Sequence, residues 1–285
     1  MPDVTFAVGS DRVLGTLTES RGPSRGTLIL VHGLQSCRRE FGDAPERLAE
    51  RGFTVLSIDL RGCGESGGER GILSRRSAVE DVRGAIHWLR EEGHARARIG
   101  IVGHSLGGAL AAACLAELPD LRSGVLVAPV NRLTDEVNPA ELLGLRLGAK
   151  LSKTLHRFRG RHLEFPYKMA RQYERLFDDK EAAARARQAA ILSPNLNLGN
   201  FDNFHEVHGA AWAKHVTQPT LVVLCKNDRA LKPRSQRKVY DALAGPKQLV
   251  ELDSGHSAFG DRNAARLIDA IDGWMGKALG AIPQV

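Results

Sequence analysis

The sequence predicts an α/β protein with a mostly parallel central sheet flanked by helices and a helical insertion. Apolar runs typical of buried strands occur at residues 27–32, 53–60 and 98–104, near 124 and 220, and at 247–252. Helical stretches separate several of these runs. Unbroken apolar strands that alternate with helices are typical of a parallel sheet buried on both faces. The 285 residues are enough for one large core with an insertion.

The elements follow in a regular order. An N-terminal hairpin turns at residues 9–11, because short β-type runs flank Gly, Ser and Asp there. The strand at 27–32 leads into a helical stretch around Leu48 and then into the strand at 53–60. A helix over 75–92 carries apolar residues at three- and four-residue spacing and precedes the strand at 98–104. The C-terminal helix has one apolar face, which comprises Leu267, Ile268, Ile271 and Trp274.

Residues 131–215 break this alternation and predict a helical cap inserted between the core segments 1–130 and 216–285. No strand is predicted there, SPNLNLGNFDN is typical of a loop, and a helical spacing links Leu143, Leu147, Leu151 and Leu155. A basic run on the same helix is interpreted as its solvated face, opposite the leucines. The alternative is contact with an anionic substrate group, such as a carboxylate or the phosphates of an acyl-CoA. The run comprises Lys150, Lys153, Arg157, Arg159 and Arg161.

Composition and charge favour a globular protein outside the membrane. No apolar run approaches the roughly 20 residues that span a bilayer, and the N-terminus lacks secretory-signal features, so we expect a cytoplasmic protein. The net charge of +7 is spread along the chain without interleaved aromatic residues, which favours a basic surface over a nucleic-acid site. A disulfide framework or zinc site is not expected from the scattered Cys37, Cys63, Cys114 and Cys225.

Chemically active residues follow four of the predicted strands, at the end where parallel sheets bind ligands. The strand at 27–32 ends in HGLQ, and the strand at 98–104 runs into the Gly-x-Ser-x-Gly turn that holds Ser105. TLVVLC is followed by Lys-Asn-Asp with Asp228, and KQLVEL by Asp-Ser-Gly-His with His256. A nucleophile, an acid and a base therefore occur in the order Ser, Asp, His.

This order fits nucleophilic catalysis. A serine hydroxyl needs a base to accept its proton, and a carboxylate holds the histidine in the correct tautomer. Side chains at positions 103 and 107 would collide with the neighbouring strand and helix, which explains Gly103 and Gly107 in a sharp turn. The N–H groups of Leu106, at a helix N-terminus, and of Leu34, in the HGLQ loop, are placed to stabilise an oxyanion.

The segment VHGLQSCRREFGDAPERLAERGFTVLSIDLRGCGESGGERG, together with GHSLGG, the ND of LVVLCKNDRAL and the GH of ELDSGHSAF, resembles the α/β-hydrolase superfamily. The likeness is to its monoacylglycerol lipase-like and serine aminopeptidase-like branch. It covers nearly all of the core, but not residues 131–215. The resemblance implies an α/β-hydrolase fold with Ser105 as nucleophile, Asp228 and His256 as its partners, and Leu34 and Leu106 as oxyanion-hole amides.

Several residues have other interpretations. Asp135, after the strand near 124, is the alternative acid. Asp59 is expected to fix its own loop through backbone hydrogen bonds, and Asp253 to belong to the turn that precedes His256. His32 is expected to pack beside the oxyanion loop and His104 to shape the elbow around Ser105. The spacing of His205 and His208 admits a metal, but no third ligand is suitably spaced, so no metal is expected. The remaining histidines, among them His156 and His162, are interpreted as surface or core residues.

These observations predict a serine hydrolase that cleaves carboxylic esters, either a carboxylesterase or a monoacylglycerol lipase-like enzyme. It would act on a small acyl ester without a metal or organic cofactor, and without nucleic acid or a membrane span. A serine nucleophile argues against haloalkane dehalogenase and epoxide hydrolase chemistry. Thioesterase or peptidase activity and a triad-retaining ligand receptor are the alternatives. An apolar acyl pocket is expected from the leucines of the cap and from Phe158, Phe165, Tyr167, Phe201 and Phe204.

Overall fold

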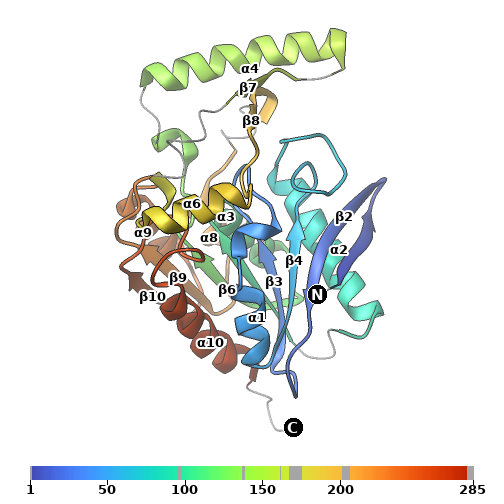
Figure 1. Ribbon diagram of the computed structural model, residues 1–285, viewed down its shortest axis with the longest axis vertical. Helices are drawn as coiled ribbons and strands as arrows, with labels where there is room; N and C mark the ends of the chain where they lie inside the picture. Colours follow the sequence, from blue (N-terminus) through green and yellow to red (C-terminus); the bar gives the residue numbers. More distant parts are fainter. Residues whose placement is uncertain are drawn as a thin grey trace.

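A computed structural model of the protein describes residues 2–94, 98–136, 139–160, 162–166, 175–200 and 206–280. One eight-stranded sheet comprises β1 (Asp3–Val8), β2 (Asp11–Thr18), β3 (Gly26–Val31), β4 (Phe53–Asp59), β5 (Ile99–His104), β6 (Leu121–Val127), β9 (Thr220–Cys225) and β10 (Lys247–Leu252) (Figure 1). The strand order is β1-β2-β4-β3-β5-β6-β9-β10. β1 and β2 pair antiparallel, as do β2 and β4, while every pair from β4 to β10 is parallel. The predicted mostly parallel sheet and N-terminal hairpin are confirmed.

Helices cover both faces of the sheet. α1 (Ala44–Glu50) and α10 (Ala264–Gly280) pack on one face. The other face carries α2 (Arg75–Glu91), α3 (Leu106–Glu117), α8 (Gly209–Ala213) and α9 (Pro233–Ala242). Successive β3 side chains alternate between these layers, with Ile29 and Val31 toward α3, and Leu28 and Leu30 toward α10. Because both faces of β3 are buried, its sequence is an unbroken apolar run. Burial of each Leu or Ile side chain stabilises the folded state by about 1.5–3 kcal/mol relative to an exposed side chain.

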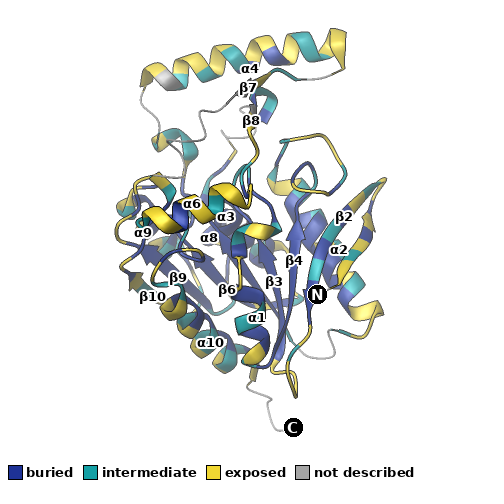
Figure 2. Ribbon diagram, in the orientation of Figure 1, coloured by how far each residue is buried: buried dark blue, intermediate teal, exposed yellow. Residues whose placement is uncertain are grey.

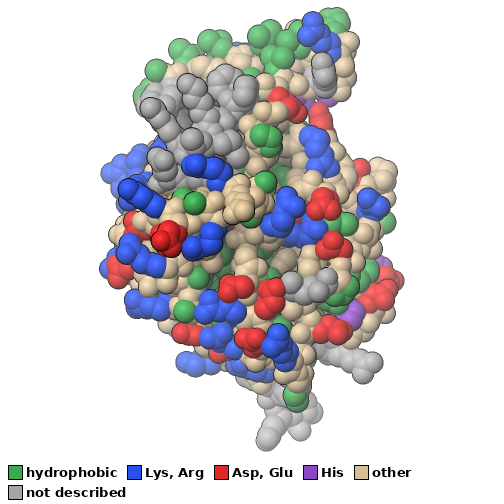
Figure 3. Space-filling view, in the orientation of Figure 1, with side chains coloured by type: hydrophobic (Ala, Val, Ile, Leu, Met, Phe, Trp, Pro, Cys, Tyr) green, Lys and Arg blue, Asp and Glu red, His purple; other side chains and the backbone are tan. Residues whose placement is uncertain are grey.

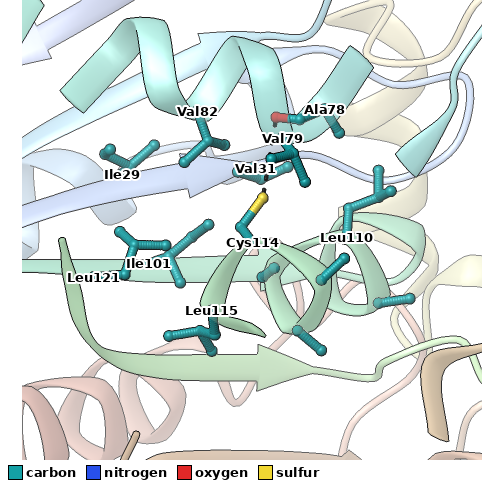
Figure 4. Close-up of a cluster of buried hydrophobic side chains, with 14 of the residues drawn as sticks. Ile29, Val31, Ala78, Val79, Val82, Ile101, Leu110, Cys114, Leu115 and Leu121 are labelled. Atoms are coloured by element: carbon teal, nitrogen blue, oxygen red, sulfur yellow. Dashed lines mark hydrogen bonds between the residues drawn. The ribbon is translucent and has the colours of Figure 1, made fainter. Parts of the chain in front are cut away.

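α3 is buried on every side, which explains its sequence of small and apolar residues. Figure 4 shows Leu110, Cys114 and Leu115 of this helix between α2 and the sheet. The Cys114 thiol lies 4.0 Å from the carbonyl oxygen of Ala78 in α2, and otherwise packs as a small hydrophobic group. All four cysteines are buried and unpaired.

The insertion between β6 and β9 lies partly beyond the sheet. It contains η2 (Leu133–Asp135), α4 (Pro139–Arg159), β7 (Glu164–Pro166), α6 (Lys180–Gln188), β8 (Asn195–Asn197) and η3 (Leu198–Asn200). α4 lies at one end of the molecule, with β7 and β8 beneath it (Figure 1). β7 and β8 form a two-stranded antiparallel sheet that the sequence analysis did not predict, because strands of three residues are too short to leave a periodic pattern. α8, by contrast, buries Trp212 and Ala213 in the core beside α3.

The described basic residues of α4 lie on a solvated face, as predicted, but the leucines expected on the other side of the helix are exposed too, contrary to the prediction that they line an apolar pocket. Leu143, Leu147 and Leu151 are 59%, 59% and 55% exposed, and Figures 2 and 3 show an exposed, largely apolar outer surface on this helix. The described basic residues of the run are exposed as well, while Ala149 and Ser152 are the buried positions. Arg161 lies outside the described residues. Among the helices that the structure describes, none combines the length and apolar character needed to cross a bilayer.

Candidate active site

Ser105 occupies a strained turn between β5 and α3. Its backbone has φ 57° and ψ −119°, a conformation that a residue with a side chain rarely adopts. The turn is held by hydrogen bonds from the Ser105 N–H to the Val127 oxygen (2.9 Å) and from the Val130 N–H to the Ser105 oxygen (3.1 Å). A Cβ on Gly103 would lie 2.1 Å from the Gly107 oxygen, and one on Gly107 would lie 2.2 Å from the Val31 oxygen. The predicted steric need for both glycines is confirmed.

The structure brings the three predicted catalytic side chains together. The Ser105 hydroxyl lies 2.8 Å from His256 Nε2, and His256 Nδ1 lies 2.6 Å from Asp228 Oδ2. All three residues are buried and follow the carboxyl ends of β5, β10 and β9. With Nδ1–H donating to the carboxylate, Nε2 is free to accept the serine proton. The alternative acid, Asp135, is exposed in η2, where its backbone oxygen accepts a hydrogen bond from Lys232 Nζ.

Asp228 is fixed by hydrogen bonds on both carboxylate oxygens. Oδ1 accepts the N–H groups of Ala230 and Leu231, each at 2.8 Å. Oδ2, which faces His256, also accepts Gln236 Nε2 at 2.7 Å. Gln236 is fully buried on α9, and its Oε1 accepts the Cys225 N–H at 3.0 Å. Sequence reasoning missed Gln236, because α9 is largely polar and no motif marks a residue whose contact is made only in the folded chain.

Two peptide N–H groups near Ser105, those of Leu34 and Leu106, have no hydrogen-bond acceptor among the described residues. Leu106 is the first residue of α3, where the helix dipole favours negative charge. Leu34 lies in a turn closed by the Ser36 N–H and the Gly33 oxygen at 3.3 Å. A Cβ on Gly33 would lie 3.2 Å from the Ser105 Cβ, so this turn packs directly against the serine. The two N–H groups could therefore stabilise charge on one substrate oxygen.

A buried ion pair links the loop after β3 to the loop that carries His256. Glu40 Oε1 accepts the Gly33 N–H at 2.9 Å and lies 3.1 Å from His104 Nδ1, while His104 Nε2 donates to the His256 backbone oxygen at 2.9 Å. Burial alone would raise the pKa of Glu40 and lower the pKa of His104. The opposite charge of each partner dominates, so the pKa of Glu40 is lowered and the pKa of His104 is raised. His104 thus does more than shape the elbow, and sequence reasoning missed Glu40.

Other predicted structural roles are confirmed. His32 is buried, where its Nε2 accepts the Leu60 N–H at 3.1 Å and its Nδ1 donates to the Gly33 oxygen at 2.8 Å. Asp59 accepts the backbone N–H groups of Arg38 at 2.6 Å and Glu65 at 2.9 Å, and so fixes its own loop. Asp253 lies in the bend between β10 and His256, as expected, and forms an exposed ion pair of 2.6 Å with Lys226.

Of the two histidines with metal-like spacing, the structure describes only His208. His208 Nδ1 accepts hydrogen bonds from Arg132, and the guanidinium lowers the pKa of that histidine in addition to its burial. His205 lies outside the described residues.

Apolar side chains from the insertion lie next to Leu34, in the loop after β3. The Leu34 side chain belongs to a small cluster around Ala149 of α4, which also includes Leu133, Leu142, Leu145 and Leu198. Phe158 is 84% exposed and does not line this region, contrary to expectation. The Phe165 side chain and Tyr167, Phe201 and Phe204 lie outside the described part. A groove of about 610 Å³ between β1 and α2 contains none of the predicted catalytic residues.

Comparisons with known proteins identify the family and the fold. A family model described as "Serine aminopeptidase, S33" matches residues 22–263. An uncharacterized 31.7 kDa protein from the traX-finO intergenic region of Escherichia coli is 28% identical over 260 residues, which cover 84% of this chain and 87% of that protein. The monoacylglycerol lipase of Mycolicibacterium smegmatis is 30% identical over 147 residues, which cover 51% of this chain and 52% of the lipase. The solved monoacylglycerol lipase of Paleococcus ferrophilus shares the fold, with a TM-score of 0.75 and 22% identity over 93% of this chain and 99% of that chain.

Proposed function

Because the chain belongs to the serine aminopeptidase family of α/β-hydrolases, we propose that it is a serine hydrolase that cleaves carboxylic esters through an acyl-enzyme on Ser105. The observation that carries this proposal is the chain of contacts from the Ser105 hydroxyl to His256 Nε2 (2.8 Å) and from His256 Nδ1 to Asp228 (2.6 Å). The two peptide N–H groups beside the serine supply the other requirement of acyl transfer, stabilisation of the oxyanion.

In the proposed mechanism His256 Nε2 accepts the proton of the Ser105 hydroxyl while the serine oxygen attacks the ester carbonyl. The N–H groups of Leu34 and Leu106 stabilise the negative charge on the carbonyl oxygen. Asp228, held in place by two backbone N–H groups and Gln236, orients the imidazole and stabilises the imidazolium that forms. His256 then protonates the leaving alcohol. Water repeats these steps on the acyl-enzyme and releases the acid.

We propose that the segment from α4 to β8 forms the cap and contributes to an apolar acyl site. Leu142 and Leu145 of α4 pack in the same cluster as Leu34, whose N–H is a proposed oxyanion donor. An apolar acyl chain bound at the serine would contact this cluster. The described basic residues of α4 are exposed and outside this apolar cluster, so they are not part of the proposed acyl site.

The proposal is tested by labelling the chain with a fluorophosphonate probe and by measuring hydrolysis of p-nitrophenyl esters of increasing acyl length. Wild-type protein should be labelled once and should hydrolyse the esters. Ser105→Ala should lose both properties. Ser193→Ala is the matched control, because the Ser193 hydroxyl is exposed and donates only to the Asn195 oxygen, and it should behave as wild type.

Hydrolysis that persists in Ser105→Ala would refute the nucleophile assignment. Labelling at Ser105 without turnover of any ester would instead support a ligand receptor that retains the triad. A rate that does not depend on acyl length would contradict the apolar acyl site.

A further inference from the structure

Three potential metal ligands from distant parts of the sequence meet where α4 approaches the loop after β4. They are Glu69 of that loop, His156 of α4 and His162 just beyond it. Their nearest ligand atoms all lie within 4.8 Å of one another. Glu69 Oε1 lies 3.3 Å from His162 Nε2 and 3.6 Å from His156 Nδ1. None of the three belongs to the proposed catalytic machinery.

The two distances from Glu69 are close to the ligand spacing of a tetrahedral metal ion. Zn²⁺ binds imidazole nitrogen and carboxylate oxygen at about 2.0–2.2 Å, which places two ligands of one tetrahedral ion about 3.3 Å apart. The two imidazole rings stack nearly parallel with centroids 4.1 Å apart, so one ring would rotate to direct its lone pair at the ion. In addition, His156 Nδ1 is a buried nitrogen without a hydrogen-bond partner among the described residues. A buried polar atom in this state is unfavourable, and an ion at the centre of the cluster would satisfy it.

Neighbouring groups hold the His162 ring with Nε2 toward Glu69. The Ser152 hydroxyl, on a fully buried residue of α4, lies 3.1 Å from His162 Nδ1 and also accepts the Leu163 N–H at 2.9 Å. When Nδ1–H donates to this oxygen, Nε2 carries the free lone pair that a metal requires, as in known metal sites. A Cβ on Gly199 would lie 2.5 Å from the ring, so the ring packs closely against backbone on its other side.

Glu69 lies on a loop with many backbone hydrogen bonds. The Gly62 N–H donates to the Gly67 oxygen at 2.7 Å, and the Gly71 N–H donates to the Gly62 oxygen at 2.8 Å. Asn197 of β8 donates its side-chain amide to the Arg70 oxygen at 2.6 Å. The carboxylate is therefore presented by an ordered part of the core, while both histidines belong to the insertion.

We propose that Glu69, His156 and His162 bind one divalent transition-metal ion, with Zn²⁺ the best match, which ties α4 to the core. Two imidazoles and one carboxylate form a donor set suited to Zn²⁺, and water would complete the tetrahedron. The ion would be structural, because none of its three ligands belongs to the proposed catalytic machinery. α4 has few buried residues, so one coordinate link to the core would restrict its position strongly.

Calorimetric titration of the full chain with ZnCl₂ tests this site. We expect one ion per chain in the wild type, with Co²⁺ binding at the same stoichiometry and giving visible d–d absorption. Glu69→Gln and His162→Gln should each weaken Zn²⁺ binding at least about tenfold. Removing a residue that only hydrogen-bonds to a metal ligand already weakens binding by about 10–100-fold, so loss of a ligand itself should cost at least the lower value. His87→Gln is the matched control, because His87 and Glu91 offer only two exposed ligand atoms, 3.0 Å apart. This variant should bind Zn²⁺ as tightly as the wild type does.

Trypsin gives a second readout of the link between α4 and the core. Zn²⁺ should slow cleavage at Lys150 and Lys153 in the wild type, but not in Glu69→Gln. Glu69 is half-exposed, so the glutamine variant should melt at the wild-type temperature without metal. Equal Zn²⁺ affinity in the wild type, Glu69→Gln and His162→Gln would overturn the proposal, as would loss of binding in His87→Gln. Equal protection of α4 in wild type and Glu69→Gln would refute the proposed link.

Discussion

Replacing Glu40 with glutamine tests whether the buried ion pair beside Ser105 holds the site together. The Glu40 and His104 side chains are only 7% and 5% exposed, and Glu40 also accepts the Gly33 N–H. Glutamine keeps the size of the side chain and an acceptor for Gly33, so the main loss is the negative charge facing His104. Breaking a buried ion pair costs about 3–5 kcal/mol. We expect the lower end, about 3 kcal/mol, because glutamine retains neutral hydrogen bonds.

The effect should depend on pH in a defined way. The pKa of Glu40 is lowered from 4.5 by His104, so its contribution is present above pH 4.5 and is lost as pH falls through the lowered pKa. The pKa of His104 is raised from 6.5 by Glu40, so its contribution is present below pH 6.5 and is lost as pH rises through the raised pKa. The stability difference between wild type and variant should therefore be largest between pH 4.5 and 6.5.

Urea unfolding of wild type, Glu40→Gln and a control measures this difference. Glu50→Gln is the matched control, because Glu50 pairs with Arg21 at 2.9 Å with side chains 51% and 67% exposed. Exposed pairs contribute about 0–1 kcal/mol, so this variant should stay close to wild type. Glu40→Gln should also slow labelling of Ser105 by the fluorophosphonate, because Gly33 packs against the serine. If Glu40→Gln is no less stable than Glu50→Gln between pH 4.5 and 6.5, the reasoning is refuted.

Three further predictions concern the acid and the thiols. Asp228→Asn should lower kcat for p-nitrophenyl esters about 10⁴-fold, because asparagine favours the wrong tautomer of His256. The control Asp253→Asn should retain wild-type kcat. A small loss of kcat in Asp228→Asn would argue against Asp228 as the acid. Gln236→Leu should cost about 1–3 kcal/mol in urea unfolding, because the Cys225 N–H loses its acceptor, and should also lower kcat. An unchanged kcat would mean that Gln236 does not position Asp228. Burial raises the pKa of Cys63 to about 12, so iodoacetamide should leave this thiol unmodified in the folded chain near neutral pH and alkylate it after unfolding. Mass spectrometry of digests measures the modification. Rapid alkylation of Cys63 in the folded chain would contradict its buried environment.

The sequence alone predicts the sheet and the positions of Ser105, Asp228 and His256. The strands at 27–32 and 98–104 are buried on both faces, so they remain apolar throughout and are recognisable without the fold. The glycines around Ser105 reflect contacts within one strand–turn–helix unit. Because the carboxyl ends of parallel strands meet at one edge of a sheet, residues that follow β5, β9 and β10 are brought together by topology, and their order along the chain suffices to predict the site.

Only the tertiary structure determines which side chains support that site and where the insertion lies. Glu40 meets His104 across 64 residues, and Gln236 reaches Asp228 from a helix whose polar sequence gives no sign of it. Glu69 meets His162 only because α4 lies over the loop after β4. The spacing of Leu143 and Leu147 predicts a helix, but not which side faces the solvent. Periodicity reports the geometry of one element, whereas these contacts depend on how separate elements pack, which no local pattern encodes.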